Sequence, residues 1–304
     1  MLGLQGGGTT LVTRCLLRHP SAVSMSGNSS YWVATDELGF VRNRMAALPR
    51  SLWGSSHRDD LPHPIFGTDH RSVWACDELL PAYRRTANDA TPADAAQFRQ
   101  LLREHVAVYA RDRHSARFVD KTHANAVRIP YLDALLDGQQ PFFVLVLRNP
   151  YGICPRALRR KPPSWRTPLP YERQLTLAAQ HWENLTRLAL EDGRRTDRFG
   201  AIRFEDFLRN PEAVVQAICE LVGLSYRPEL VPRPGDSRPF ATLPTDTKWY
   251  PLREDSWEVS EEEIAIVAAR CGRLATRLGY SPVPELAQPE PDLLLDASRA
   301  AAPE

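Results

Sequence analysis

The sequence has few of the features that mark membrane, secreted or nucleic-acid-coating proteins. No apolar run is longer than Phe142–Leu147, whereas a membrane-spanning helix needs about 20 apolar residues. The opening residues, MLGLQGGGTT, have no basic segment before an apolar one, so we expect no signal peptide and a cytoplasmic protein. Basic residues number 38 and acidic residues 37, a net charge of +1 that argues against a general nucleic-acid coat protein.

Cysteine is scarce, and metal-binding spacing is lacking. The five cysteines, at positions 15, 76, 154, 219 and 271, are scattered and form no CxxC pair. This usage is typical of a reducing compartment and excludes a disulfide framework or a cysteine-rich zinc site. Three histidines, His57, His63 and His70, are spaced six and seven apart, which fits loops better than a zinc-binding helix. We therefore expect no metal.

Apolar patterning predicts an α/β fold in which a parallel sheet is flanked by helices. The run Phe142–Leu147 is apolar throughout, as in a strand covered on both faces, and 117–119 and 201–204 are weaker strands. Four helices are predicted, at 91–108, 175–190, 210–222 and 260–278. Thr91, Asn210 and Ser260 stand at capping positions before three of them. Strands that alternate with helices favour a parallel sheet.

We expect one main domain over 1–281. Within it, 21–116 is irregular at first and rich in Trp, His, Arg and Pro, and we interpret it as an acceptor-side insertion or lid. Residues 282–304 combine prolines with acids and few aromatics, which predicts a flexible tail.

A glycine-rich loop near the N-terminus predicts an anion site. Gly6, Gly7 and Gly8 lack a Cβ, so their N–H groups can turn around an anion, and Thr9 and Thr10 then open a helix. The loop lacks the lysine of GxxxxGK[ST] and the spacing of GxGxxG, which excludes a regular Walker A loop and argues against a Rossmann dinucleotide site.

A second anion site is predicted where the central strand ends. Arg148 follows Phe142–Leu147 directly, and Pro150 stands where a new helix would begin. Parallel α/β folds bind ligands at the carboxyl ends of their strands, and arginine can hold two phosphate oxygens. Arg156 lies eight residues further along.

Five segments, in order, resemble the sulfotransferase family that uses 3′-phosphoadenosine 5′-phosphosulfate (PAPS). GLQGGGTTLVTRCLLRHP is similar to the family's GLPRSGTTLL…HP loop for the 5′-phosphosulfate. FFVLVLRNPYGICPRAL resembles its strand–loop–helix for the 3′-phosphate. The remaining three are FVDKTHANAVRIPYLDALL, RFEDFLRNPEAVVQAICELVGL and KWYPL…LGY.

The resemblance implies a PAPS-binding enzyme that needs no metal. The loop residues Gln5–Thr10, together with Arg148, Arg156, Lys248 and Trp249, would contact the donor. Lys121, which matches an assisting lysine of protein-tyrosine members, would assist catalysis from beside the loop. Glu37 would be the base, with His57, His63 and His70 as rivals. The family's loop cation is missing, because Gly6 stands in its place.

The resemblance leaves the acceptor open. The lack of a membrane anchor disfavours a Golgi-type enzyme, and the Ala- and Arg-rich composition indicates a bacterial source, so we expect a small-molecule or glycan acceptor. Two other functions stay possible at this point: a non-catalytic nucleotide-binding relative, favoured by Gly6, and a nucleotide kinase with an aberrant loop.

Overall fold

The computed structural model describes residues 1–24, 48–55, 58–159, 169–231, 259–283 and 285–296. The elements in chain order are β1 (Leu2–Gly3), α1 (Thr9–Leu17), β2 (Ala22–Val23), η2 (Arg50–Leu52), α2 (Leu80–Tyr83), η3 (Ala87–Asp89), α3 (Pro92–Tyr109), β3 (Arg117–Phe118), η4 (His123–Val127), α4 (Ile129–Leu135), β4 (Phe143–Leu147), α5 (Pro150–Arg159), α6 (Tyr171–Gly193), β5 (Phe199–Arg203), α7 (Phe204–Arg209), α8 (Pro211–Val222), η5 (Pro228–Leu230) and α9 (Glu261–Arg277).

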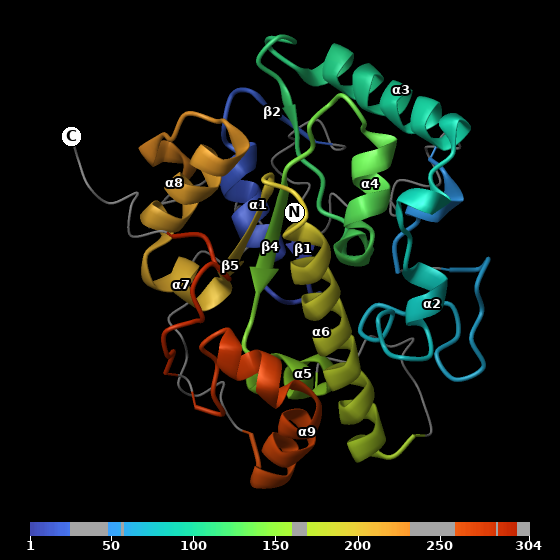
Figure 1. The fold of residues 1–304 in the computed structure, drawn as a ribbon, viewed down its shortest axis with the longest axis vertical. Coiled ribbons are helices and arrows are strands. Elements are labelled where there is room, and N and C mark those ends of the chain that lie inside the picture. Colours follow the sequence, from blue (N-terminus) through green and yellow to red (C-terminus); the bar gives the residue numbers. More distant parts are fainter. Residues whose placement is uncertain (25–47, 56–57, 160–168, 232–258, 284, 297–304) are drawn as a thin grey trace.

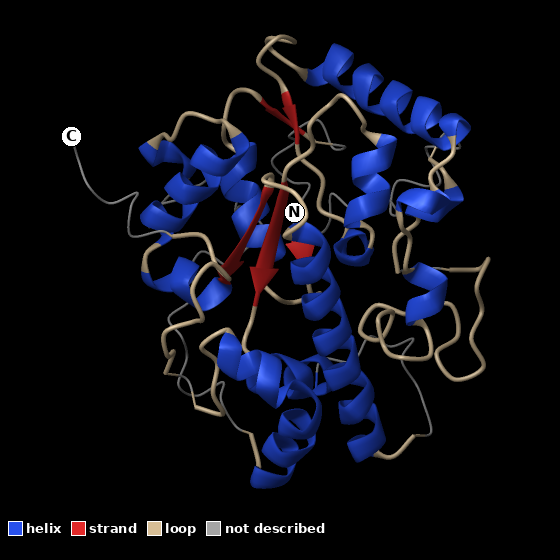
Figure 2. Cartoon of the chain, viewed as in Figure 1, coloured by secondary structure: helices blue, strands red, loops and turns tan. Residues whose placement is uncertain are grey.

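The described strands are all parallel, as the sequence predicts. β4 lies at the centre of a three-stranded sheet between β1 and β5, and β2 pairs with β3 (Figures 1 and 2). All five residues of β4 are buried. β1 has only two residues and pairs with the second half of β4. The carboxyl ends of β1 and β4 therefore lie side by side, which brings the two predicted anion loops together.

Helices cover both faces of this sheet (Figure 1). Phe143, Leu145 and Leu147 belong to the core cluster that contains buried residues of α6 and α9, whereas Val144 and Val146 belong to the cluster built from α1 and α8. Successive side chains of a strand point to opposite faces, so one apolar run serves both cores. The result is a single α/β domain in which the sheet is flanked by helices.

The predicted helix caps are present. The Thr91 and Ser260 hydroxyls accept hydrogen bonds from Asp94 N–H (3.0 Å) and Glu263 N–H (3.2 Å), at the starts of α3 and α9. Asn210 caps α8 in the same way, and Gly223 ends that helix in the left-handed conformation. The sequence placed two boundaries wrongly. α6 runs from Tyr171 to Gly193, and β5 begins at Phe199 rather than Ala201.

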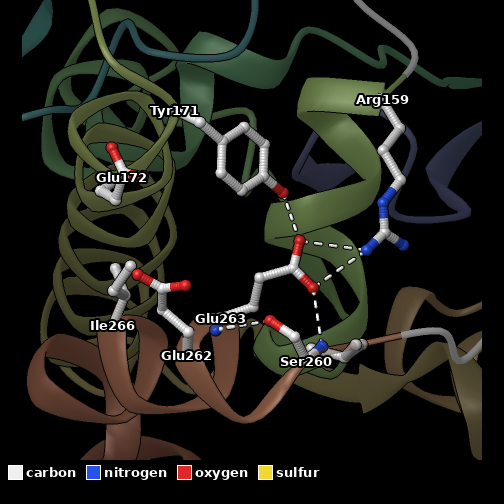
Figure 3. Close-up of a pocket in the computed structure, with 8 residues that line it drawn as sticks. Arg159, Tyr171, Glu172, Ser260, Glu262, Glu263 and Ile266 are labelled. Carbon is white, nitrogen blue, oxygen red and sulfur yellow. Dashed lines mark hydrogen bonds and ion pairs between the residues drawn. The ribbon is translucent and has the colours of Figure 1, made fainter.

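One carboxylate ties three helices together below the sheet. Glu263 of α9 accepts hydrogen bonds from the Arg159 guanidinium of α5 at 3.0 Å and from the Tyr171 hydroxyl of α6 (Figure 3). The same carboxylate receives the Ser260 N–H at 2.9 Å, which completes a capping box. The shallow hollow around it is lined by this network, so we assign it a structural role.

Part of the segment expected to form a tail lies against the sheet. Leu295 N–H donates to the Ala201 carbonyl of β5 at 2.8 Å, and the Leu295 side chain packs where Gly200 has no Cβ. Arg203 of β5 donates to the Ala287 carbonyl at 2.8 Å, and Leu293 is buried. Residues 285–296 therefore cover the outer edge of β5, a position that protects an edge strand from pairing with another chain.

All five cysteines are free and buried. Burial raises the pKa of Cys15 to about 12 and the pKa values of Cys76 and Cys219 to about 11. These three thiols therefore stay protonated in the folded protein, as expected for packing residues.

Candidate active site

The loop between β1 and α1 has the backbone shape that the glycines predict. Gly6 and Gly8 adopt φ of 75° and 96°, in the left-handed region that favours glycine. Gly7 N–H donates to the Leu4 carbonyl at 3.0 Å, so one of the three expected donors is used within the loop. Leu11 N–H donates to the carbonyl of Gly8, the residue before α1, at 3.0 Å. The first N–H groups of a helix point out of its end, and this end attracts anions.

Phe204 explains why the loop needs glycine at position 8. A Cβ on Gly8 would lie 2.1 Å from the Phe204 ring, and a Cβ on Gly7 would lie 2.9 Å from the Leu4 carbonyl oxygen. The loop is therefore packed closely from behind. Gly6 differs, because the nearest atom to its Cβ would be Ile153 Cδ1 at 3.6 Å, yet its positive φ still disfavours a side chain.

Lys121 lies beside the start of α1, as expected. It follows β3, is 1% exposed, and its ammonium donates to the Thr10 hydroxyl at 3.2 Å. The two carboxylate oxygens of the neighbouring Asp120 accept hydrogen bonds from the Thr122 hydroxyl and the Asn125 amide, each at 3.0 Å. A buried ammonium thus stands at the end of the helix that an anion would approach.

His123 is a site residue that the sequence analysis missed. It begins η4, is 4% exposed, and its Nε2 lies 3.3 Å from the Thr9 hydroxyl. Burial, with the Lys121 charge as a further cause, holds the pKa of His123 well below its ordinary value of 6.5, so the ring is neutral. The available signal was its position two residues after Lys121, just past a predicted strand.

Arg148 joins the two loops. Its Nη1 donates to the Gly6 carbonyl at 2.7 Å, and its guanidinium lies over the Phe204 ring with Cζ 5.1 Å from the centroid. The side chain is half-buried, so one face of the guanidinium is supported by an aromatic ring. The sequence predicted a phosphate ligand at this position but not its contact with the first loop.

Buried polar contacts hold the turn after Arg148. Asn149 N–H donates to the Glu205 carboxylate at 2.9 Å, and the Asn149 side chain accepts from Tyr151 N–H at 3.0 Å, at the start of α5. The Tyr280 hydroxyl donates to the other oxygen of Glu205 at 3.1 Å. Burial raises the pKa of Glu205, and these hydrogen bonds act against the rise. Glu205 therefore positions the loop between β4 and α5 through its hydrogen bond with Asn149.

The other predicted site residues are placed as follows. Arg156 lies half-buried on α5. His63 and His70 have both ring nitrogens engaged in their own segment: His63 with Ile65 N–H and with Glu78, and His70 with Tyr83 and the Gly67 carbonyl. Glu37, His57, Lys248 and Trp249 lie outside the described residues.

The described residues lack both a metal-ligand cluster and a membrane-spanning helix. They contain no group of three His, Cys, Asp or Glu side chains arranged to hold a metal ion. None of the helices in that part of the chain combines the length and the hydropathy that a membrane crossing requires.

Comparison with known proteins gives a family. A model described as the sulfotransferase family matches residues 1–228. No curated protein gives a significant match. Similar solved structures include the sulfotransferase domain from the curacin biosynthetic pathway (17% identity, TM-score 0.49, covering 92% of this chain and 96% of that one). They also include the sulfotransferase domain from the Synechococcus PCC 7002 olefin synthase (20%, 0.43, 88% and 92%) and a sulfotransferase from Alicyclobacillus acidocaldarius (15%, 0.45, 92% and 95%).

Proposed function

The chain belongs to the sulfotransferase family, and on that premise we propose that it transfers a sulfuryl group from PAPS to a hydroxyl of a small-molecule or carbohydrate acceptor. The observation that carries the proposal is the contact between the Lys121 ammonium and the Thr10 hydroxyl at the start of α1. It sets a buried positive charge beside a helix N-terminus and a glycine loop, where a phosphosulfate group would find charge and N–H donors together.

The donor set fits a nucleotide with phosphate groups at its 5′ and 3′ positions. Because Gly7 and Gly8 have no Cβ, the backbone can lie against the Leu4 carbonyl and the Phe204 ring in the shape of an anion-binding loop. Gln5–Thr10 would hold the 5′-phosphosulfate, and Arg148 and Arg156 would hold the 3′-phosphate. The contact of Arg148 with the Gly6 carbonyl supports a single site made from both loops. Lys248 and Trp249 complete the proposed donor site.

Lys121 takes the role that a loop cation has in the family. PAPS, when bound, supplies the sulfuryl group, and negative charge grows on the phosphate oxygen that it leaves. A preorganised donor at such an oxygen is worth about 10²–10³-fold in rate. Gly6 has no side chain to offer there, whereas Lys121 is already buried next to Thr10, so we assign it the stabilisation of that charge.

The base that takes the acceptor proton has two leading candidates. Glu37 is the residue that the family resemblance favours. His123 has the support of geometry, because its neutral ring stands 3.3 Å from Thr9 and close to Lys121 in sequence. A neutral imidazole can accept a proton, as a general base must. His57 remains a rival, while the contacts of His63 and His70 favour structural roles for those two.

The state of the cysteines supports a proposal for the cellular compartment. Five free, buried thiols support a reducing compartment, so we propose that the enzyme works in the cytoplasm of a bacterium. Residues 21–116 are proposed to form the acceptor side of the cleft.

Binding and turnover test the proposal in that order. In calorimetry, adenosine 3′,5′-bisphosphate should bind without magnesium, whereas a nucleotide kinase would need the metal for its triphosphate. Transfer of labelled sulfate from PAPS to a panel of alcohols and glycans then separates an enzyme from a non-catalytic relative, which Gly6 would favour. Absence of bisphosphate binding would contradict the proposed donor.

A further inference from the structure

A small cavity with a few polar groups lies beside the glycine loop, between α5, α6 and residue Ser72. Its volume is about 20 Å³, enough for one oxygen atom of a ligand or one water. Gln5, Ser72 and His181 supply most of its polar groups, and the other lining residues are largely apolar. Gln5 and Ser72 are half-buried, whereas His181 is 4% exposed. The cavity therefore reaches from the loop into the protein, with His181 in its deeper part.

His181 is held in one orientation and one tautomer. Its Nδ1 accepts a hydrogen bond from Ala75 N–H at 3.0 Å, so the ring proton must sit on Nε2. Trp74 packs edge-on against the ring, with centroids 4.8 Å apart. Asn184, three residues along α6, donates to the Ala75 carbonyl at 2.9 Å and fixes the same segment.

The Nε2–H group of His181 is a donor that has no acceptor among the described residues. Within the described residues, Nε2 is buried and has no hydrogen-bond partner, an arrangement that costs free energy unless a bound molecule supplies an acceptor. Burial lowers the pKa of His181 to about 3, so the ring is neutral at any physiological pH. With its proton on Nε2, the ring can donate a hydrogen bond into the cavity but cannot act there as a base.

The position of the cavity ties it to the reaction centre. Gln5 belongs to the loop proposed to hold the phosphosulfate, and α6 packs against η4, which begins at His123. An oxygen bound at His181 would thus belong to a molecule that reaches the proposed sulfuryl-transfer site.

We propose that His181 and Ser72, beside Gln5, form a subsite for a second, non-reacting hydroxyl of the acceptor, and that the enzyme therefore prefers diols and sugars to simple alcohols. The lining of the cavity contains no Asp, Glu, Lys or Arg, and His181 is neutral, so the subsite recognises a neutral oxygen and not a carboxylate, phosphate or amine. A site built to hydrogen-bond a hydroxyl discriminates against an analogue that lacks it, because its own donor is then left unpaired. The inference rests on the proposed function.

A matched pair of acceptors tests the subsite. In labelled-sulfate assays, kcat/KM for trans-1,2-cyclohexanediol should exceed that for cyclohexanol by about tenfold, the equivalent of one hydrogen bond. His181→Asn keeps an acceptor near the Nδ1 position for Ala75 N–H but removes the Nε2 donor, so the ratio should fall to about one. His105→Asn, the same change on α3, should leave the ratio as it is. Ser72→Ala, which disturbs the packing least, should lower it in part.

A second readout does not depend on turnover. In protein labelled with ¹⁵N-histidine, the diol should shift the His181 Nε2–H resonance and cyclohexanol should not. Equal ratios for wild type, His181→Asn and Ser72→Ala would overturn the proposal, as would a resonance that ignores the diol, which would indicate a fixed water. Loss of bisphosphate binding would instead refute the proposed function, and the diol titration of the unloaded protein would still decide the subsite.

Discussion

The two loops predicted to bind anions are built in opposite ways. The loop between β1 and α1 works through backbone, with Gly6 and Gly8 in left-handed conformations and a close contact between Gly8 and the Phe204 ring. The loop between β4 and α5 works through side chains, with Arg148 at its surface and Asn149 held by Glu205. Substitutions in the first loop should therefore impair binding by changing the backbone shape. Substitutions in the second loop should impair it by removing charge and hydrogen bonds.

The largest effect is expected from a single methyl group on the backbone loop. Gly8→Ala would place a Cβ 2.1 Å from the Phe204 ring at a φ of 96°. Overpacking and left-handed strain together should lower the free energy of unfolding by about 4 kcal/mol, measured by urea denaturation, and bisphosphate binding should be lost.

Gly223→Ala separates the two causes. Gly223 has a φ of 67°, but nothing lies within 4 Å of its would-be Cβ. It should lose only the strain, about 1–2 kcal/mol. Equal losses at the two glycines would show that the contact with Phe204 is unimportant.

The next effect concerns the lysine that serves the backbone loop. Lys121→Met keeps the length of the side chain and should lower kcat by about 10²–10³-fold, since a preorganised donor to the leaving oxygen is removed. Bisphosphate affinity should fall far less, because the charge that Lys121 stabilises grows only during transfer. A loss of affinity as large as the loss of kcat would make Lys121 a binding residue.

A lysine at position 6 is not expected to rescue that variant. Gly6→Lys would restore a loop cation without strain only if φ at position 6 were negative, but φ is 75°. A side chain there would strain the loop it is meant to assist.

In the loop between β4 and α5, a substitution should weaken nucleotide binding by removing charge. Arg148→Ala should weaken adenosine 3′,5′-bisphosphate binding by about 10- to 100-fold, the scale of a charge-assisted hydrogen bond. Adenosine 5′-phosphate, which lacks the 3′-phosphate, should bind the variant and the wild type almost equally well in the same calorimetric titration. If both nucleotides lose affinity alike, Arg148 serves the first loop through Gly6 and not the 3′-phosphate.

The smallest effect is a change in how the free energy of unfolding depends on pH, and it concerns Glu205. Burial raises the pKa of Glu205 above its ordinary value of 4.5, so the native protein holds this proton more tightly than the unfolded chain does. The stability it contributes is present below pH 4.5 and is lost as the pH rises through the raised pKa. Glu205→Gln removes that loss, so urea denaturation should show the stability of the variant improving relative to wild type as the pH rises above 4.5.

Tyr280→Phe is the opposing control for Glu205. It removes a hydrogen bond to the carboxylate, which should raise the Glu205 pKa further and make the pH dependence steeper. The same slope in both variants would show that Glu205 does not titrate in this range.

Local patterns were enough to predict most of the fold. The apolar run Phe142–Leu147 became the central strand, and the capping residues at 91, 210 and 260 marked helix starts correctly. The glycines before Thr9 became a loop that leads into a helix. These features depend on neighbours in sequence, so a sequence can display them.

The contacts that complete the site depend on residues far apart in the chain. Nothing near Gly8 indicates that the Phe204 ring lies against it, and nothing near Arg148 indicates a bond to Gly6. His123 was missed because its proximity to Thr9 arises only when η4 packs beside α1. The sequence analysis looked for the base before residue 91 instead. Two of the candidates there, Glu37 and His57, lie outside the described residues, so they remain predictions.

The five buried thiols can report local unfolding of the protein. A buried thiol is inaccessible to a disulfide reagent, so the folded chain should react with one very slowly. Cys15 and Cys219 lie in the core around α1 and α8, while Cys154 and Cys271 lie in the core around α6 and α9. The rate at which each is modified would therefore measure, without any added label, how often each face of the sheet comes apart.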